Sequence, residues 1–550
     1  MRAGWSAAAC LGVALLACLA YLPTLRAGYV WDDDSYVTEN DTLRSAAGLA
    51  KIWLEPSASP QYYPAVFTTF WCEYHVWQLR PAGYHAVNLV LHLLTAALVW
   101  RVLKRLGVVA AGLAAAIFAL HPVSVESVAW ITERKNVLSA VFCIGCVLAY
   151  LHFDPPDRPG APRDRRSYAL ACVLFLFALL SKSVTASLPV ALAVVYWWHQ
   201  GRVSPRRLIP LLPLLALGVS VGLYTSWLEA TQVGASGGEW ALSPLARGLI
   251  AGRALVFYAG KLVWPARLCF IYPRWEIDPG LVWQYTYPLA VLALLAGLFV
   301  ARSRIGRAPL AALLCFTITL FPALGFLNVY PQRYSWVADH FQYLASIAPI
   351  ALAAAGLGRM SSAWPVSLRI SAGAGVLCLL ALLSFRQNEV YRDSETLWRN
   401  TLQCNPDCFL AHTNLGNILL RRGEVEAALP HYRASVAIRP DDFVSVNDLA
   451  WLLATGPQGV RSPAEAVALA ERAASATQYG FAPALETLAA AYAGVGRFDD
   501  AVWMAERGLR IARLAADPKT ERDLKSELEF YRTHRPYLLQ TSTEGKAREE

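Results

Sequence analysis

Long apolar runs separated by short polar loops dominate the first two thirds of the chain. A membrane-spanning helix needs about 20 mostly apolar residues. We predict eleven spans, centred on residues 5–22, 84–102, 108–120, 137–153, 168–181, 184–199, 208–227, 283–300, 309–326, 343–358 and 366–385. The first run is long for the apolar part of a signal peptide, so we interpret it as a retained helix. The pattern predicts an all-α, polytopic membrane domain over residues 1–385.

The pattern changes after residue 385 to that of a water-soluble helical segment. Residues 386–408 are predicted as a linker helix, and residues 409–442 carry small and aromatic positions typical of a tetratricopeptide (TPR) helix pair. The same pattern recurs 73 residues later, where Ala489 occupies the position that Gly416 occupies in the first repeat. This distance equals two repeats of about 34 residues plus an insertion. We therefore predict a soluble TPR domain with repeats at 409–442, 443–481 and 482–515, followed by a C-terminal helix and a disordered tail over 516–550.

Basic residues predict which loops face the cytoplasm. Lys and Arg gather in the loops near residues 101–105, 158–166, 202–207 and 302–307, which all fall on one side if the N-terminus is cytoplasmic. Counting residues 249–264 as a span would break this agreement, and Arg253 and Lys261 would be costly in lipid. We therefore predict an interfacial or re-entrant helix near 249–264. The large loop 23–83 and the repeats then lie on the non-cytoplasmic face.

Composition supports a membrane protein and argues against a nucleic-acid partner. Hydrophobic residues make up 56% of the chain and charged residues 16%, with a mean hydropathy of +0.36, whereas soluble domains average about 25% charged residues. The net charge of +9 arises largely from the basic loops. It is thus better explained as a topology signal than as a nucleic-acid footprint.

Three adjacent carboxylates open the first external loop: Asp32, Asp33 and Asp34. Neighbouring carboxylates repel one another, so they raise a pKa, meet a cation or are solvated. Their place beside the membrane and next to many aromatic residues makes them candidates for chemistry. The same aromatic residues also fit an interfacial belt.

A second polar cluster lies between two predicted spans on the same face. Its candidates are His121, Glu126, Arg134 and Lys135. Further charged or titratable residues on that face are Lys182, Arg333, Asp339 and His340. Ionisable groups at membrane depth are functional candidates, although the cations could also pair with Glu133 and lipid headgroups.

Several stretches, taken together, resemble a known family. They are Trp31-Asp32-Asp33, HPVSVESVAWITERKNVLSAVF, LSKSVTASLPVALAVVYWW, KLVWPARLCFIYPRWEIDP and RYSWVADHFQYLAS, followed by the repeats. This set is similar to that of the transmembrane-and-TPR-containing O-mannosyltransferases and their bacterial relatives. The resemblance implies a GT-C glycosyltransferase architecture, a polyprenyl- or dolichyl-phosphate-linked sugar donor and a carboxylate motif in the first external loop. The chain departs from the family in Tyr196-Trp197-Trp198, where relatives often carry Asp-Tyr-Trp, and in its small number of repeats, so sugar and acceptor stay open.

The candidate residues have expected roles. The resemblance implies the role of the carboxylates, and the phosphate contacts are expected from the chemistry of the cations on the same face. Asp32 or Asp33 would be the catalytic base or would orient the acceptor. The donor phosphate would bind Arg134 and Lys135, with Arg253, Lys261 and Arg333 as alternatives. A divalent metal at Asp32 and Asp33 is an open alternative, since hard cations favour carboxylate oxygens, and no other cofactor is expected. A structural role is expected for His121.

The sequence thus predicts a membrane glycosyltransferase that moves a sugar, with mannose as first choice, from a lipid-phosphate donor to a protein or glycan hydroxyl. The repeats would engage the acceptor or a partner protein. The alternatives are a polymerase or ligase of lipid-linked glycans and a non-catalytic TPR scaffold. We expect a bacterial inner membrane with periplasmic repeats, and the alternative is an endoplasmic-reticulum membrane with luminal repeats.

Overall fold

The structure is a computed structural model that describes residues 7–158, 160, 162–202, 204–235, 237–515 and 517–539. The described residues are helical and contain no strand. They divide into two compact units, one up to Leu397 and one from Trp398. The predicted disordered end from residue 540 onward lies outside the described residues.

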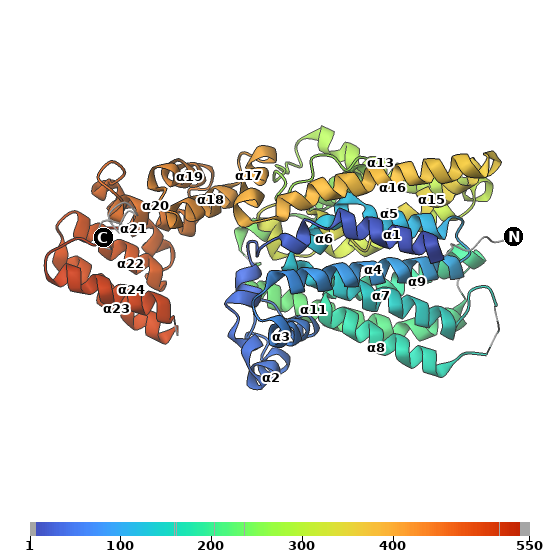
Figure 1. Ribbon diagram of the computed structural model, residues 1–550, viewed down its shortest axis with the longest axis horizontal. Coiled ribbons are helices and arrows are strands. Elements are labelled where there is room, and N and C mark those ends of the chain that lie inside the picture. The colour runs from blue at the N-terminus through green and yellow to red at the C-terminus, as the bar shows by residue number, and fades with distance from the viewer. Residues whose placement is uncertain are drawn as a thin grey trace. The chain divides into compact units, whose positions relative to one another are not determined.

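In the first unit, a helix forms in each of the eleven apolar segments. These helices are α1 (Ala7–Ala20), α4 (Pro81–Arg105), α5 (Ala111–Leu120), α7 (Arg134–Phe153), α8 (Arg165–Ser181), α9 (Leu188–Gln200), α11 (Leu212–Leu228), α13 (Thr286–Ile305), α14 (Ala308–Leu320), α15 (Ile347–Met360) and α16 (Val366–Asn388). They run roughly alongside one another in Figure 1. Continuous apolar sequence therefore forms a bundle of helices, as expected.

Helix length sets which of these segments can cross a membrane. Among the described residues, five helical stretches are long and apolar enough, or six if the bent pair Ala111–Leu120 and Pro122–Ala129 counts as one span. The bend between the two members of that pair is 56°. The unit is that of a multi-pass membrane protein, and the count of eleven crossings stays a prediction.

The large loop after α1 folds into a cap of short helices at one end of the bundle. It contains α2 (Ala46–Leu54) and α3 (Pro64–Trp77), and Figure 1 places both at the end where α4 begins. An aromatic core made of Tyr36, Phe67, Phe70 and Tyr84 packs inside the cap and is buried. At the opposite end of the bundle α7 stops and α8 starts.

Helix α12 covers the segment whose topology was ambiguous. It runs over Pro244–Val263 and is outside the set of helices long and apolar enough to span a membrane among the described residues. Gly252 lets it approach the next helix closely, because a Cβ there would lie 2.5 Å from the Pro288 nitrogen. The interfacial or re-entrant placement stays a prediction.

The second unit is built from helix pairs whose bounds follow the predicted repeats. It contains α18 (Phe409–Arg421), α19 (Val425–Ile438), α20 (Phe443–Thr455), α21 (Pro463–Ala476), α22 (Ala482–Gly494), α23 (Phe498–Leu514) and α24 (Pro518–Arg532), and α17 (Ser394–Cys404) begins before the boundary. Gly416 of α18 faces the ring of Tyr432 of α19 so closely that a Cβ would lie 3.0 Å from it. The small residue at this position thus sets the spacing of the pair. The predicted ranges fit helix pairs, and their assignment as TPR repeats stays a prediction.

A buried pair of acids makes the second unit sensitive to pH. Burial raises the pKa of both Glu486 and Glu527, and the charge of Glu486 raises that of Glu527 further. The hydrogen bond between the two carboxyls lowers the pKa of Glu486 and raises that of Glu527. Asp523 adds to the repulsion, Lys519 reduces it at Glu486, and the Tyr531 hydroxyl donates to Glu527 at 3.1 Å. The folded unit therefore holds protons that the unfolded chain releases above about pH 4.3.

We expect this unit to lose stability as pH rises from about 5 to 8. Both folded-state pKa values are raised, so the stabilisation is complete below the unfolded pKa and is lost as pH rises through the folded values. A loss of about 1 to 2 kcal/mol corresponds to a fall in Tm of several degrees for a unit of this size. Thermal melting should reveal this fall, and Glu527→Gln should remove most of it. A melting temperature that is constant from pH 5 to 8 would contradict the shared-proton pair.

Candidate active site

The start of the loop after α1 is fixed in an unusual backbone conformation. The Gly28 amide donates to the Arg392 carbonyl at 2.9 Å, and Trp31 has φ of +48°, in the left-handed region that side chains rarely adopt. The Trp31 ring stacks on Trp130 with centroids 5.3 Å apart and meets Phe270 edge-on at 5.3 Å. This aromatic packing holds the strained turn and aims the following carboxylate at Trp130.

Asp32 is the half-buried carboxylate of the run. Its Oδ1 accepts from the Trp130 indole at 3.0 Å, and its side chain is half-buried. Burial raises the pKa of Asp32 to about 6, although the nearby Lys135 ammonium opposes the rise. A carboxylate with a pKa near the working pH suits general-base catalysis.

Asp33 and Asp34 have other surroundings. Asp33 is 0% exposed and accepts from the Thr132 amide at 2.8 Å, the Thr132 hydroxyl at 2.7 Å and the Val30 amide at 2.9 Å. Burial, with Asp32 adding, raises its pKa to about 8. Asp34 is exposed and accepts from the Thr38 hydroxyl at 3.0 Å. The geometry thus makes Asp33 an anchor between the loop and residue 132, whereas Asp34 lies on the surface.

Two lysines share one buried glutamate beside this loop. Glu133 is 0% exposed and lies 3.0 Å from the Lys135 ammonium and 3.2 Å from the Lys182 ammonium. Asn136 accepts from Lys182 at 2.8 Å and donates to Glu133. The lysine side chains stay 11% and 12% exposed. Lys135 and Lys182 thus bring two ammonium groups together, and the carboxylates of Asp32 and Glu126 also act on them. Ammonium groups are suited to bind phosphate.

A second carboxylate network surrounds His340. Glu126 accepts from the His340 amide at 3.1 Å and from its Nδ1 at 2.9 Å. The other ring nitrogen of His340 lies 3.9 Å from Glu133. Asp339 accepts from the Tyr272 hydroxyl at 3.0 Å, and burial raises its pKa well above the usual range. The structure therefore joins Glu126 and His340 to Glu133 and Lys182, whereas Asp339 contacts Tyr272.

Arg134, which was a first choice for the donor phosphate, is bound by protein groups of α3 and α4. It is 0% exposed and pairs with Glu73 of α3 through both terminal nitrogens, one of them 3.1 Å from Oε2. It also donates to Asn88 and, at 2.9 Å, to the Tyr84 carbonyl. These contacts occupy the guanidinium inside the protein, so the geometry favours a structural role for it.

The remaining predicted cations are also engaged by protein groups. Arg253 lies over the Trp275 ring at 4.3 Å from its centroid. Lys261 donates to the Ala266 carbonyl at 2.8 Å, and Arg333 lies 3.7 Å from Glu239. These contacts do not involve Glu133, Lys135 or Lys182.

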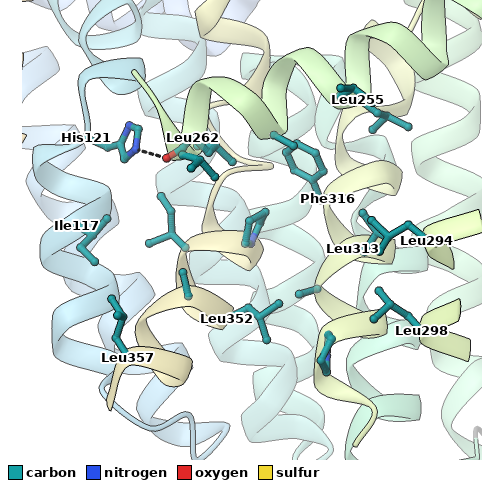
Figure 2. Close-up of a pocket in the computed structure, with 18 of the residues that line it drawn as sticks. Ile117, His121, Leu255, Leu262, Leu294, Leu298, Leu313, Phe316, Leu352 and Leu357 are labelled. Carbon is teal, nitrogen blue, oxygen red and sulfur yellow. Dashed lines mark hydrogen bonds between the residues drawn. The ribbon is translucent and has the colours of Figure 1, made fainter. Parts of the chain in front are cut away.

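His121 joins backbone segments beside a large apolar cavity. Its Nε2 donates to the Leu262 carbonyl at 3.0 Å, and Figure 2 shows this bond at one edge of the cavity. The cavity has a volume of about 660 Å³ and is lined mainly by aliphatic side chains of α12 to α16. These contacts agree with the structural role expected for His121.

The cavity beside Trp31 and Trp130 is small. A cavity of about 30 Å³ lies between Trp31, Trp130, Phe270, Glu126 and His340. This volume accepts about one water molecule and no sugar. Sugar entry would therefore require movement of the surrounding loops.

The donors at the Asp run do not assemble a metal site. Both Asp33 oxygens already accept hydrogen bonds, and Asp32 accepts from the Trp130 indole. Within the described ranges, no group of three or more His, Cys, Asp or Glu side chains is placed to hold a metal ion. We therefore derive no step through a metal.

Sequence reasoning missed several residues of this site. Glu73, Trp130, Thr132 and Tyr272 were not candidates, yet they contact Arg134, Asp32, Asp33 and Asp339 respectively. Trp130 and Thr132 lie inside the polar stretch already singled out, so its density was a usable signal. No spacing in the sequence connects Glu73 with Arg134.

Comparison with known proteins finds relatives of one kind. Protein O-mannosyl-transferase TMTC1 of Homo sapiens is 26% identical over 522 residues, which cover 82% of this chain and 58% of that protein. Protein O-mannosyl-transferase Tmtc1 of Drosophila melanogaster is 34% identical over 193 residues, which cover 32% of this chain and 21% of that protein. Protein O-mannosyl-transferase F38B6.6 of Caenorhabditis elegans is 23% identical over 451 residues, which cover 77% and 62%. The predicted resemblance to this family is confirmed, and the chain spans less than two thirds of the length of each of these relatives.

Two further comparisons are less informative. No family model matches the chain. The cryo-EM structure of arabinofuranosyltransferase AftD from Mycobacteria aligns with 70% of this chain and 27% of that one, with a TM-score of 0.37 and 18% identity. A TM-score this low does not define a shared fold.

Proposed function

We propose that this chain is a membrane glycosyltransferase that transfers a sugar, with mannose as first choice, from a polyprenyl-phosphate donor to a hydroxyl of a protein or glycan. The reaction would take place on the non-cytoplasmic face, and the repeats would engage the acceptor or a partner protein. The observation that carries this proposal is the half-buried Asp32 carboxylate near Lys135, in a cluster where Lys135 and Lys182 share Glu133. The named activity of the relatives supports the same reaction class.

The residues support a direct displacement. The acceptor oxygen attacks the anomeric carbon of the sugar while its proton passes to Asp32. The bond between the anomeric carbon and the phosphate oxygen breaks, and the lipid phosphate leaves with the electron pair. Lys135 and Lys182 would stabilise the charge that develops on the phosphate, because preorganised cations lower the barrier to such steps. Asp33 would hold the loop, and Glu126 would orient His340.

The lipid part of the donor needs apolar surface near the cluster. The aliphatic cavity in Figure 2 offers apolar surface among α12 to α16, and His121 at its edge begins the polar stretch that contains Glu126 and Lys135. Burial of prenyl groups there would contribute affinity at about 25 cal/mol per Å² of apolar area. This fit supports a lipid-linked donor over a water-soluble nucleotide sugar.

The rate of transfer should rise with pH through an apparent pKa near 6. Asp32 must be ionised to accept the proton, and burial raises its pKa to about 6. Transfer should therefore fall about tenfold for each pH unit below about 5.5 and level off above about 7. The measurement is the pH dependence of kcat/KM with purified protein in detergent. A profile that stays flat from pH 5 to 8 would remove Asp32 as the base.

Loss of Lys182 should weaken catalysis without unfolding the protein. Lys182→Met removes one of the two cations, and we expect kcat/KM to fall about 10²-fold, close to the 10²–10³ seen when one stabilising donor is removed. Lys51→Met is the matched control, since Lys51 is an exposed lysine of α2. Steady-state kinetics with a lipid-linked donor measures both variants. Equal effects of the two substitutions would contradict the phosphate assignment.

A further inference from the structure

The chain folds back on the second unit directly after its last helix. At the end of α24, His534 adopts φ of +52°, and the Arg535 amide donates to the Phe530 carbonyl at 2.9 Å. Residues 535–539 then continue without regular secondary structure. The turn therefore directs a short extended segment, Arg535–Leu539, back along the helices.

This segment contacts α20 and α24 through one aromatic ring and one backbone bond. The Tyr537 ring lies 6.1 Å from that of Trp451 in α20 and 5.7 Å from that of Phe530 in α24. The Leu539 amide donates to the Thr455 carbonyl at 2.8 Å. Thr455 is the last residue of α20, where carbonyls lack partners inside the helix. The segment therefore satisfies an acceptor that the helix leaves open.

The same face of α20 carries a further polar group that is ready for a ligand. Asn447, Trp451 and Thr455 are spaced four residues apart, so they lie on one face of the helix. Asn447 is 9% exposed, and its side-chain oxygen is buried and has no hydrogen-bond partner within the described part of the chain. A buried acceptor without a partner destabilises the folded state. A peptide donor at this position would remove that cost.

We propose that this face of α20, together with Phe530 of α24, is a binding site for an extended peptide with an aromatic side chain, and that residues 535–539 occupy it as an internal competitor. The recognised pattern would be an aromatic residue that inserts between Trp451 and Phe530, followed two residues later by a free backbone amide for Thr455. Main-chain bonds give such a site affinity, and the aromatic pocket gives it selectivity. An external segment must first displace Tyr537, so the internal segment sets the threshold for binding. The proposal concerns peptide capture and does not depend on sugar transfer.

Peptide binding to the whole protein tests this proposal. The probe is a fluorescein-labelled peptide with the sequence of residues 533–539 (THRPYLL), and fluorescence anisotropy measures its affinity for the purified chain in detergent. A chain that ends at Pro536 should bind the probe at least tenfold more tightly than the whole chain, because the internal competitor is gone. A probe with Ala in place of the tyrosine, or with an N-methyl group on the last leucine, should bind at least tenfold more weakly to the shortened chain.

Two substitutions in the whole chain keep the test independent of shortening. Tyr537→Ala should increase probe affinity severalfold, since it removes the ring from between Trp451 and Phe530. Leu538→Ala is the matched control, because Leu538 is 42% exposed, and it should bind like wild type. Equal affinity of the whole chain, the shortened chain and Tyr537→Ala would overturn the proposal. So would the absence of binding by Tyr537→Ala at an unchanged melting temperature.

Discussion

Asp32→Asn should reduce sugar transfer about 10³-fold while the protein stays folded. The Asn oxygen can still accept the Trp130 indole hydrogen bond that Asp32 accepts at 3.0 Å, but an amide cannot take the acceptor proton. General-base catalysis contributes about 10²–10⁴-fold, which sets the expected loss. Transfer of radiolabelled sugar from a polyprenyl-phosphate donor, at matched melting temperatures, measures the effect.

The neighbouring carboxylates supply the controls. Asp34→Asn should transfer at close to the wild-type rate, because Asp34 is exposed and bonds to Thr38. Asp33→Asn should lose stability as well as activity, since an amide nitrogen would face the donors of Thr132 or Val30. Wild-type transfer by Asp32→Asn would contradict the assignment, and so would an equal loss in Asp34→Asn.

Glu73→Gln should destabilise the membrane unit by about 3–5 kcal/mol. It leaves the Arg134 guanidinium buried without its carboxylate, and breaking a buried ion pair from one side costs about this much. Thermal unfolding in detergent, followed by circular dichroism, checks the prediction. The expected result is a lower melting temperature together with an unchanged KM for the lipid-linked donor in the protein that remains folded.

The same experiment separates the two roles considered for Arg134. Glu55→Gln is the control, because Glu55 is exposed and should change melting little. If Glu73→Gln left the melting temperature unchanged but raised the KM for the donor, Arg134 would be acting on phosphate. That outcome would contradict the structural role inferred from its burial.

Local sequence patterns were enough to predict the helices. Each of the eleven apolar segments forms a helix, and the helix pairs of the second unit follow the predicted repeat ranges. Both predictions depend on the periodicity of apolar residues and on the Gly and Pro residues that end helices, and these signals act within a few residues. The density of polar residues between 121 and 136 likewise indicated part of the candidate site.

Roles that depend on tertiary contacts could not be predicted in this way. Asp32 and Asp33 are equivalent in the sequence, and only tertiary contacts distinguish them. Asp32 is half-buried and bonds to Trp130, whereas Asp33 is buried and anchors the loop to Thr132. Arg134 was expected at a phosphate because charged residues at membrane depth are functional candidates. Its partner Glu73 is 61 positions away, so only the packing of α3 against α7 reveals the ion pair.

The central claim is transfer of a sugar from a lipid phosphate, and one reaction tests it most directly. The purified chain in lipid nanodiscs is incubated with polyprenyl-phosphate mannose radiolabelled in the sugar and with envelope proteins as acceptors. We predict label in protein together with an equal amount of released polyprenyl phosphate, and neither product with Asp32→Asn. If folded wild-type protein transfers no label from mannose or from a panel of other lipid-linked sugars, the claim is wrong, and a non-catalytic scaffold becomes the better account.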